Sequence, residues 1–256
     1  MADVKIGCSG FLYDHWRGNF YPEGLSKNHW LEYYSKHLST VELNVTFYRL
    51  PERETFAKWY LSTPENFVFS LKGSRFITHV KKLRDCAEPI EAFFSRASVL
   101  KEKLGVILWQ FPPNFNFDID RLKDFFEALK PYGMRNTFEF RNKNWINKKV
   151  SSLLEKENAA FCMADHPAFL QNLPLTADFI YIRRHGKNGS YATSYAAEAL
   201  KEDAKFIKSH LRQKKDVFLY FNNDAHGYAP RNAAELGLLV EKKTTTKKTT
   251  KTKKKR

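Results

Sequence analysis

Short apolar segments recur eight times along the chain, and nearly all of them end in polar or charged residues. They are rich in β-branched and aromatic side chains, as buried strands are. They cover residues 4–8, 41–47, 67–71, 105–111, 137–140, 160–164, 179–183 and 217–222. Apolar and polar side chains alternate in the second segment, which predicts that Glu42, Asn44 and Thr46 share one face of a strand.

Segments with helical character separate most of these strands. They cover residues 27–37, 52–61, 89–103, 119–129, 147–157, 196–212 and 231–240. Pro89 suits the first turn of its helix, and Asp118 is a suitable N-cap for the helix that follows it. Eight strand–helix units in 256 residues predict an α/β fold, a single (β/α)8 TIM barrel spanning residues 1–241.

Polar residues at the strand ends are the candidates for chemistry, because the active site of such a barrel lies at the carboxyl ends of its strands. We expect Glu139, His185 and Asp165 to be catalytic. We expect the following residues to bind substrate: Asn44, Tyr48, Lys72, Gln110, Arg141, Arg183, Tyr191, Asn222, Asn223 and Asp224. Burying so many polar groups is costly unless they are paired, which favours a functional site.

Two glutamates interrupt apolar strand sequence. We interpret Glu42, in mid-strand, as a buried carboxylate paired with a neighbour such as Lys72, and the alternative is a general acid or base with a shifted pKa. Glu139 fits a general acid/base as well as it fits an ion pair with a base on an adjacent strand. Lost turnover at an unchanged melting temperature in a Glu139→Gln variant would indicate catalysis, and lost stability would indicate a structural role.

The seventh and eighth strands end in further candidates. The guanidinium of Arg183 suits a phosphate or carboxylate, and His185 suits proton transfer near neutral pH. Tyr191 and Tyr195 follow in a loop that could fold over the mouth or simply pack within itself. The amides and the carboxylate of residues 222–224 could bind sugar hydroxyls or phosphates, or could tie the last loop to the final helix.

The formal net charge of +15 is concentrated at one end of the chain. Residues 242–256 contain nine basic residues and no acidic or apolar ones, and removing them leaves 34 basic and 28 acidic residues, a net charge of +6. We expect this tail to be disordered. A basic tail attracts polyanions such as nucleic acid, or it is a solubilising extension.

Three widely spaced cysteines, Cys8, Cys86 and Cys162, argue against a disulfide framework. Together with the absence of a signal peptide, they predict a cytoplasmic protein. No apolar run is long enough to span a membrane. Phosphate-loop and dinucleotide-binding motifs are absent, so we predict no nucleotide cofactor. We predict no bound metal. Binding of a divalent cation by the carboxylates of Asp165, Glu139 and Asp224 is the alternative.

Seven motifs in order resemble the YecE-like family, also called domain of unknown function 72. They lie at residues 7–22, 41–48, 77–79, 110–113, 139–145, 183–186 and 220–224. The family comprises uncharacterised bacterial and archaeal (β/α)8 barrels, so the resemblance implies the fold and no established reaction. It extends from Lys5 to about Val240, without the tail. The family is also distantly similar in fold to metal-dependent barrels that cut DNA at abasic sites, whose many histidine ligands this chain lacks.

Two functions remain open from the sequence. The first is an enzyme, of hydrolase or lyase type, that acts on a small anionic substrate, phosphorylated or sugar-like, in a polar pocket at the mouth of the barrel. The second is a nucleic-acid-binding barrel that uses its basic tail and loop aromatics such as Phe11, Trp16 and Tyr48 to stack on bases. A basic rim around the mouth would favour nucleic acid. The sequence predicts no oligomeric state.

Overall fold

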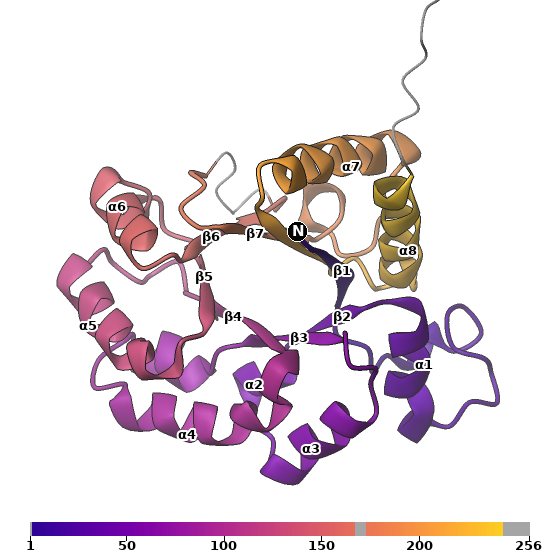
Figure 1. Ribbon diagram of the computed structural model, residues 1–256, viewed down its shortest axis with the longest axis horizontal. Coiled ribbons are helices and arrows are strands. Elements are labelled where there is room, and N and C mark those ends of the chain that lie inside the picture. The colour runs from indigo at the N-terminus through magenta and orange to yellow at the C-terminus, as the bar shows by residue number, and fades with distance from the viewer. Residues whose placement is uncertain (1, 167–172, 243–256) are drawn as a thin grey trace, which may run out of the picture.

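A closed barrel of eight parallel strands forms the centre of the molecule in the computed structural model, which describes residues 2–166 and 173–242 (Figure 1). The strands are β1 (Val4–Ser9), β2 (Thr40–Leu43), β3 (Val68–Lys72), β4 (Leu104–Gln110), β5 (Arg135–Glu139), β6 (Ala160–Ala164), β7 (Phe179–Arg184) and β8 (Asp216–Phe221). Each strand pairs with its neighbours in chain order, and β1 pairs with β8 to close the ring. The predicted (β/α)8 barrel is confirmed, whereas residues 243–256 of the predicted tail lie outside the described residues.

Helices surround the ring of strands (Figure 1). They are α1 (Trp30–His37), α2 (Val45–Tyr48), α3 (Arg53–Leu61), α4 (Ala87–Ala97), α5 (Ile119–Leu129), α6 (Lys148–Lys156), α7 (Ala197–Arg212) and α8 (Tyr228–Glu241). The predicted N-cap of α5 is confirmed, because the Asp118 side chain accepts a hydrogen bond from the Arg121 amide at 3.0 Å. The fourth helix begins two residues before Pro89, which still lies in its first turn.

The second strand is shorter than its alternating pattern predicts. It ends at Leu43, and the chain turns at Asn44 into the single turn of α2. The Thr46 hydroxyl stabilises this turn by donating to the carbonyl oxygens of Leu43 at 3.0 Å and Lys72 at 2.6 Å. These hydrogen bonds outweigh the β propensity of a valine, a threonine and a phenylalanine in succession. Thr46 is therefore not on the strand face that carries Glu42.

Side chains that point into the barrel change from apolar to charged along the strands. One apolar cluster includes alternate residues of β4, β6, β7 and β8 together with Ala177: Val106, Leu108, Ala160, Cys162, Ala177, Phe179, Tyr181, Phe218 and Tyr220. Next come hydroxyl groups, with Tyr220 bonded to Thr40 at 2.8 Å and to Ser70 at 2.7 Å. The carboxyl ends carry buried glutamates, a lysine and an arginine. The barrel interior therefore combines an apolar cluster with a charged end.

No helix within residues 2–166 and 173–242 is both long enough and apolar enough to cross a membrane.

Candidate functional site at the carboxyl ends of the strands

Arg183 lies between two buried glutamates that come from distant strands. Its Nε and Nη2 donate to Oε1 of Glu42 at 3.2 and 2.9 Å, and its Nη1 donates to Oε2 of Glu139 at 2.7 Å. All three side chains are almost completely buried. Because β2, β5 and β7 each direct an inward side chain to the same level, the barrel brings these residues together.

Glu42 is a paired buried carboxylate, as the sequence predicted, but its partner is not Lys72. Besides Arg183, it accepts hydrogen bonds from the Ser9 hydroxyl at 2.5 Å and the Tyr181 hydroxyl at 2.7 Å. Burial works against ionisation, but the charge of Arg183 and these hydrogen bonds hold the pKa of Glu42 below its ordinary value. The planar guanidinium bonds two carboxylates at once, which an ammonium group does less well.

Glu139 is held as a carboxylate by the cations around it. Burial raises its pKa, but the positive charges of Arg183 and Arg141 outweigh that effect and lower the pKa to about 2. The Nε of Arg141 donates to Glu139 Oε1 at 3.2 Å, and the Cys162 thiol contacts Oε2 at 3.8 Å. Arg141 keeps 26% of its side chain exposed, so it borders both the buried cluster and the solvent.

Lys72 ends β3 beside this cluster. Its ammonium nitrogen lies 4.1 Å from the centre of the Phe47 ring, and only 8% of the residue is exposed. Burial and the charge of Arg183 lower the pKa of Lys72 to about 8, while Glu139 and Glu42 act in the opposite direction. A lysine with such a pKa carries a neutral amine for part of the time near neutral pH.

His185 and Asp165 form a second group at the ends of β6 and β7. Asp165 accepts a hydrogen bond from the His185 amide at 2.7 Å and another from the Tyr195 hydroxyl. The His185 Nδ1 lies 3.7 Å from the same carboxylate. Burial, only partly offset by Asp165, lowers the pKa of His185, which favours a neutral imidazole. The Tyr191 ring meets that imidazole edge-on at 5.3 Å.

Three amides lie at the same end of the barrel. Asn44 is the N-cap residue of α2, and its Oδ1 is buried without a hydrogen bond to any residue that the structure describes. Gln110 is buried at the end of β4 and pairs in register with Glu139. Asn222 follows β8, where its amide donates to the Arg184 carbonyl at 2.7 Å. The structure thus keeps these three residues at the strand ends.

Three other predicted substrate-binding residues do not contact the buried cluster around Arg183. Asn223 is buried and ties the last loop to α8, since its Nδ2 donates to Thr193 O at 2.8 Å and to Asn232 Oδ1 at 3.0 Å. Asp224 pairs with His15 in the loop after β1, with 3.9 Å between Oδ2 and Nε2. Tyr48 is 76% exposed on α2. The interpretation of residues 222–224 as a tie to the final helix therefore fits Asn223.

The aromatic loop after β1 is not a stacking surface. Trp16 and Phe11 are buried, because Trp16 packs against Tyr13 at 5.0 Å and Phe20 at 5.6 Å between ring centres. The prediction that Phe11 and Trp16 stack on bases was wrong, because their rings are not accessible to a ligand. Aromatic rings in a long loop gain more by packing together than by facing water.

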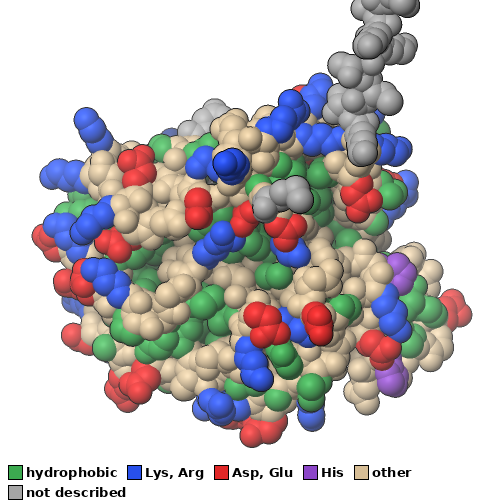
Figure 2. Space-filling view, in the orientation of Figure 1, with side chains coloured by type: hydrophobic (Ala, Val, Ile, Leu, Met, Phe, Trp, Pro, Cys, Tyr) green, Lys and Arg blue, Asp and Glu red, His purple; other side chains and the backbone are tan. Residues whose placement is uncertain are grey.

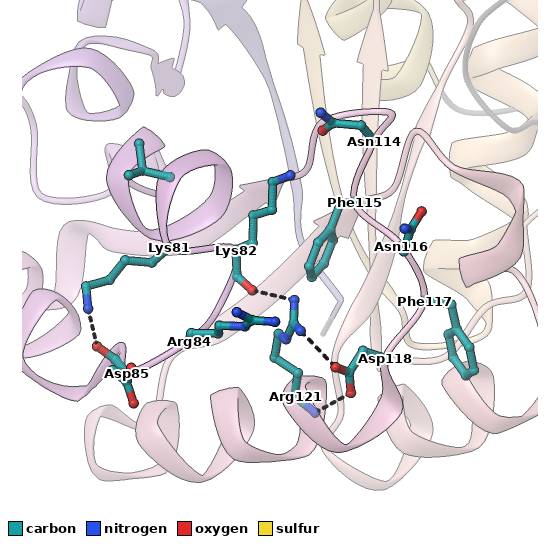
Figure 3. A pocket seen from close by; sticks show the side chains of 11 residues that line it. Lys81, Lys82, Arg84, Asp85, Asn114, Phe115, Asn116, Phe117, Asp118 and Arg121 are labelled. Carbon is teal, nitrogen blue, oxygen red and sulfur yellow. Dashed lines mark hydrogen bonds and ion pairs between the residues drawn. The ribbon is translucent and has the colours of Figure 1, made fainter.

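A basic pocket that the sequence did not single out lies in the loops after β3 and β4 (Figure 3). It has a volume of about 620 Å³, and its charged lining residues are Lys81, Lys82, Arg84, Asp85, Asp118 and Arg121. Figure 3 shows Arg121 reaching to the Lys82 carbonyl and to Asp118. The run from Lys81 to Arg84 was the available signal, but Arg121 joins it only in the folded chain. On the face seen in Figure 2, by contrast, cations and carboxylates are interspersed.

The carboxylates proposed for a divalent cation are not gathered in one place. Glu139 faces the arginines, Asp165 faces His185, and Asp224 faces His15. Among the residues described here, no group of three or more His, Cys, Asp or Glu side chains is placed to hold a metal ion.

Comparison with known families identifies the family of this chain. The model of a family described as "Protein of unknown function DUF72" matches residues 5–256. The chain belongs to the DUF72 family. The predicted resemblance is thereby confirmed, although the match extends beyond the limit near Val240 that the motifs suggested.

Two curated proteins and a solved structure are similar to this DUF72 chain. The UPF0759 protein YunF of Bacillus subtilis is 25% identical over 270 residues, which cover 93% of this chain and 95% of that protein. The UPF0759 protein YecE of Escherichia coli K12 is 35% identical over 85 residues, 33% of this chain and 31% of that protein. A DUF72 protein from Thermotoga maritima superposes with a TM-score of 0.83 at 30% identity, covering 94% of this chain and all of the other.

Proposed function

We propose that this DUF72 protein is an enzyme, of hydrolase or lyase type, that acts on a small anionic substrate at the carboxyl ends of its barrel strands. The substrate is phosphorylated or sugar-like. The proposal concerns the chemistry of the site, since the fold alone is compatible with many reactions.

The observation that carries the proposal is the charge balance of the buried cluster. Lys72, Arg141 and Arg183 supply three positive charges, whereas Glu42 and Glu139 supply two negative ones. The excess positive charge lies where Lys72 and the partly exposed Arg141 border the two buried glutamates, so one anion at this end of the barrel would stabilise the cluster. Phosphate and carboxylate groups are the anions that arginine binds best.

The roles follow from exposure and from the pKa values. Arg141, partly exposed, is the residue that would hold the anion, with Lys72 adding its charge. Glu139 stays ionised at neutral pH, so its role would be to orient the arginines and stabilise positive charge rather than to donate a proton. His185, neutral and with its Nδ1 3.7 Å from Asp165, would accept a proton. The side chains of Asn44 and Gln110 would position the substrate.

Binding of inorganic phosphate and of a panel of sugar phosphates, measured by thermal shift and calorimetry, tests the proposal. We expect phosphate compounds to raise the melting temperature, and an Arg141→Met variant to lose at least tenfold in affinity. Arg231→Met is the matched control, because Arg231 is exposed on α8 and pairs only with Glu235 among the described residues. Equal binding by the wild type, Arg141→Met and Arg231→Met would contradict the proposal.

The basic pocket favours a second candidate function, the binding of nucleic acid. Its lining cations outnumber its carboxylates by four to two, and the pocket lies on the same side of the barrel as the strand ends. Lys82, Leu83 and Asp85 also have positive φ angles of 49°, 67° and 46°, a costly conformation that often accompanies functional loops. Phosphodiester groups would fit a pocket of this charge.

A pair of double variants separates this second function from general electrostatic attraction. Lys82→Gln with Arg84→Gln removes two charges from the pocket, and Lys148→Gln with Lys149→Gln removes two exposed charges from α6. If the pocket binds nucleic acid, the first pair should weaken binding of a short DNA duplex at least fivefold more than the second. Equal losses would indicate that the pocket has no special role.

Three buried, free cysteines support a cytoplasmic location for either function, because thiols persist in a reducing compartment.

A further inference from the structure

Two lysines are buried among the described residues, and Lys72 differs from the other, Lys103, in what its amine contacts. The Nζ of Lys103 donates to the carbonyl oxygens of Tyr60 and Thr63 at 2.7 Å each, and to the Thr63 hydroxyl at 3.2 Å. The Nζ of Lys72 makes no hydrogen bond or ion pair within residues 2–166 and 173–242, and its close neighbour is the apolar ring of Phe47. The Phe47 ring gives the ammonium group a cation–π contact worth about 0.5–2 kcal/mol. Burying that group without hydrogen-bond acceptors costs more, so the balance shifts toward the neutral amine.

A neutral amine at the carboxyl ends of the barrel strands can act as a nucleophile toward the carbon of a carbonyl group. Lys72 is the last residue of β3, so the barrel fixes its backbone at the strand end, and the Phe47 ring lies against its amine. Other nucleophiles inside the barrel are poor ones, since burial raises the pKa of the Cys8 and Cys162 thiols and keeps them protonated.

We propose that Lys72 forms a Schiff base with an aldehyde or ketone substrate that also carries an anionic group. The inference rests on the proposed function, in which Arg141 holds the anion, and it names the carbonyl compound as the substrate class.

The step balances without any further reactant. The amine attacks the carbonyl carbon, a C–N bond forms, and the carbonyl oxygen becomes a hydroxyl by taking up a proton that the nitrogen releases. Loss of that hydroxyl as water, with one proton, leaves a protonated imine. Overall, the Lys72 ammonium and the carbonyl group give the protonated imine and one water molecule.

The charges of the site suit this product. A protonated imine carries the same single positive charge as the ammonium group that it replaces, so its attraction to Glu139 and Glu42 is kept. The lowered pKa of Lys72, about 8, supports the reaction further, because part of the population has the neutral amine at neutral pH.

Pyridoxal 5′-phosphate is a suitable probe, because it carries both an aldehyde and a phosphate and its imine absorbs light. The full chain is incubated with a limiting amount of the probe, reduced with borohydride, and digested for peptide mass mapping. Pyridoxal, which lacks the phosphate, serves as the matched probe, and Lys103 serves as the matched buried lysine. The denatured chain, in which both lysines should react alike, corrects for peptide detection.

We expect Lys72 to be modified at least tenfold more than Lys103 in the native chain, and inorganic phosphate to protect it. Modification of Lys72 no greater than that of Lys103 would overturn the inference. If phosphate nevertheless binds in an Arg141-dependent way, the proposed function stands and only the Schiff base fails. If Lys72 reacts equally with both probes and phosphate does not bind, the amine is reactive and the proposed anion site is wrong.

Discussion

At the scale of single residues, the arrangement around Arg183 is dominated by the cost of buried charge. Its guanidinium balances Glu42 and Glu139 with three hydrogen bonds, and none of these groups has access to bulk water. Removing one member of a buried ionic group leaves the others uncompensated, which is far more damaging than breaking an exposed pair.

An Arg183→Met variant should therefore be destabilised by about 3–5 kcal/mol. Two carboxylates would lose their counter-charge, while the apolar volume of the side chain would be largely kept. Urea denaturation monitored by tryptophan fluorescence measures the change. Arg231→Met, which breaks an exposed pair with Glu235, should cost less than about 1 kcal/mol. Similar losses in the two variants would refute the buried-charge account.

The pH dependence of stability should report on Glu139. Its pKa is about 2 in the folded chain, below the ordinary value of 4.5, so as pH falls the unfolded chain takes up the proton first. The stabilisation by the ionised carboxylate is thus present above pH 4.5 and is lost as the pH falls toward 2. It amounts to about 3 kcal/mol.

A Glu139→Gln variant should be less stable than the wild type at pH 7, and its stability should depend less on pH between 4.5 and 2. Acid titrations of the two proteins followed by circular dichroism make the comparison. Unchanged stability at pH 7 together with lost turnover would instead return Glu139 to the direct catalytic role that its strand position suggested.

At the scale of elements, Tyr195 joins the segment between β7 and α7 to Asp165, which follows β6, and so adds to the hydrogen bond from the His185 amide. The Tyr195 hydroxyl donates to Asp165 and accepts a hydrogen bond from the Gly186 amide at 2.7 Å. Gly186 has a φ of +85°, a conformation that favours glycine, and an added Cβ would lie 2.9 Å from the Thr193 hydroxyl. The position of His185 therefore depends on the segment that follows it.

Tyr195→Phe should destabilise the protein by about 1–3 kcal/mol, because it leaves the Gly186 amide without its acceptor. Hydrogen exchange should quicken in residues 185–195 and remain unchanged in β3. Tyr48→Phe removes an exposed hydroxyl and is the control, with no expected effect on either measurement. Unaltered exchange in Tyr195→Phe would show that other contacts hold the segment.

At the scale of the whole molecule, charge divides the chain into two parts. Residues 242–256 carry nine of the 43 basic residues, whereas the rest of the chain has a net charge of only +6. Attraction to a polyanion grows with the number of cations that contact it. Affinity for nucleic acid would therefore come from the tail, from the basic pocket, or from both.

Binding of a DNA duplex should be measured over a range of salt concentrations for the full chain and for a chain ending at Glu241. Loss of the tail should flatten the slope of log affinity against log salt by up to about 8. If the basic pocket binds DNA, the shorter chain should keep measurable affinity that falls further in the Lys82→Gln, Arg84→Gln double variant. Complete loss with the tail would mean that the barrel is not the binder.

Hydrophobic pattern and local chain chemistry were enough to predict the barrel, the approximate bounds of its strands, the helix cap at Asp118 and the buried state of Glu42. These features depend on side-chain periodicity and on contacts within a few residues. The end of β2 was missed, because the hydrogen bond from Thr46 to Lys72 joins residues that are 26 positions apart. The burial of Trp16 was missed for a similar reason, since it depends on how one loop folds on itself.

The sequence by itself determined that polar groups would gather at the carboxyl ends of the strands, because the alternation along each strand and the parallel order of the barrel leave no other arrangement. Only the tertiary structure decided which groups pair. Arg183 meets Glu42 across 141 residues of sequence, and this pairing leaves the amine of Lys72 against the Phe47 ring. Partner choice depends on strand register, side-chain reach and desolvation in the closed barrel, none of which can be read from residue order alone.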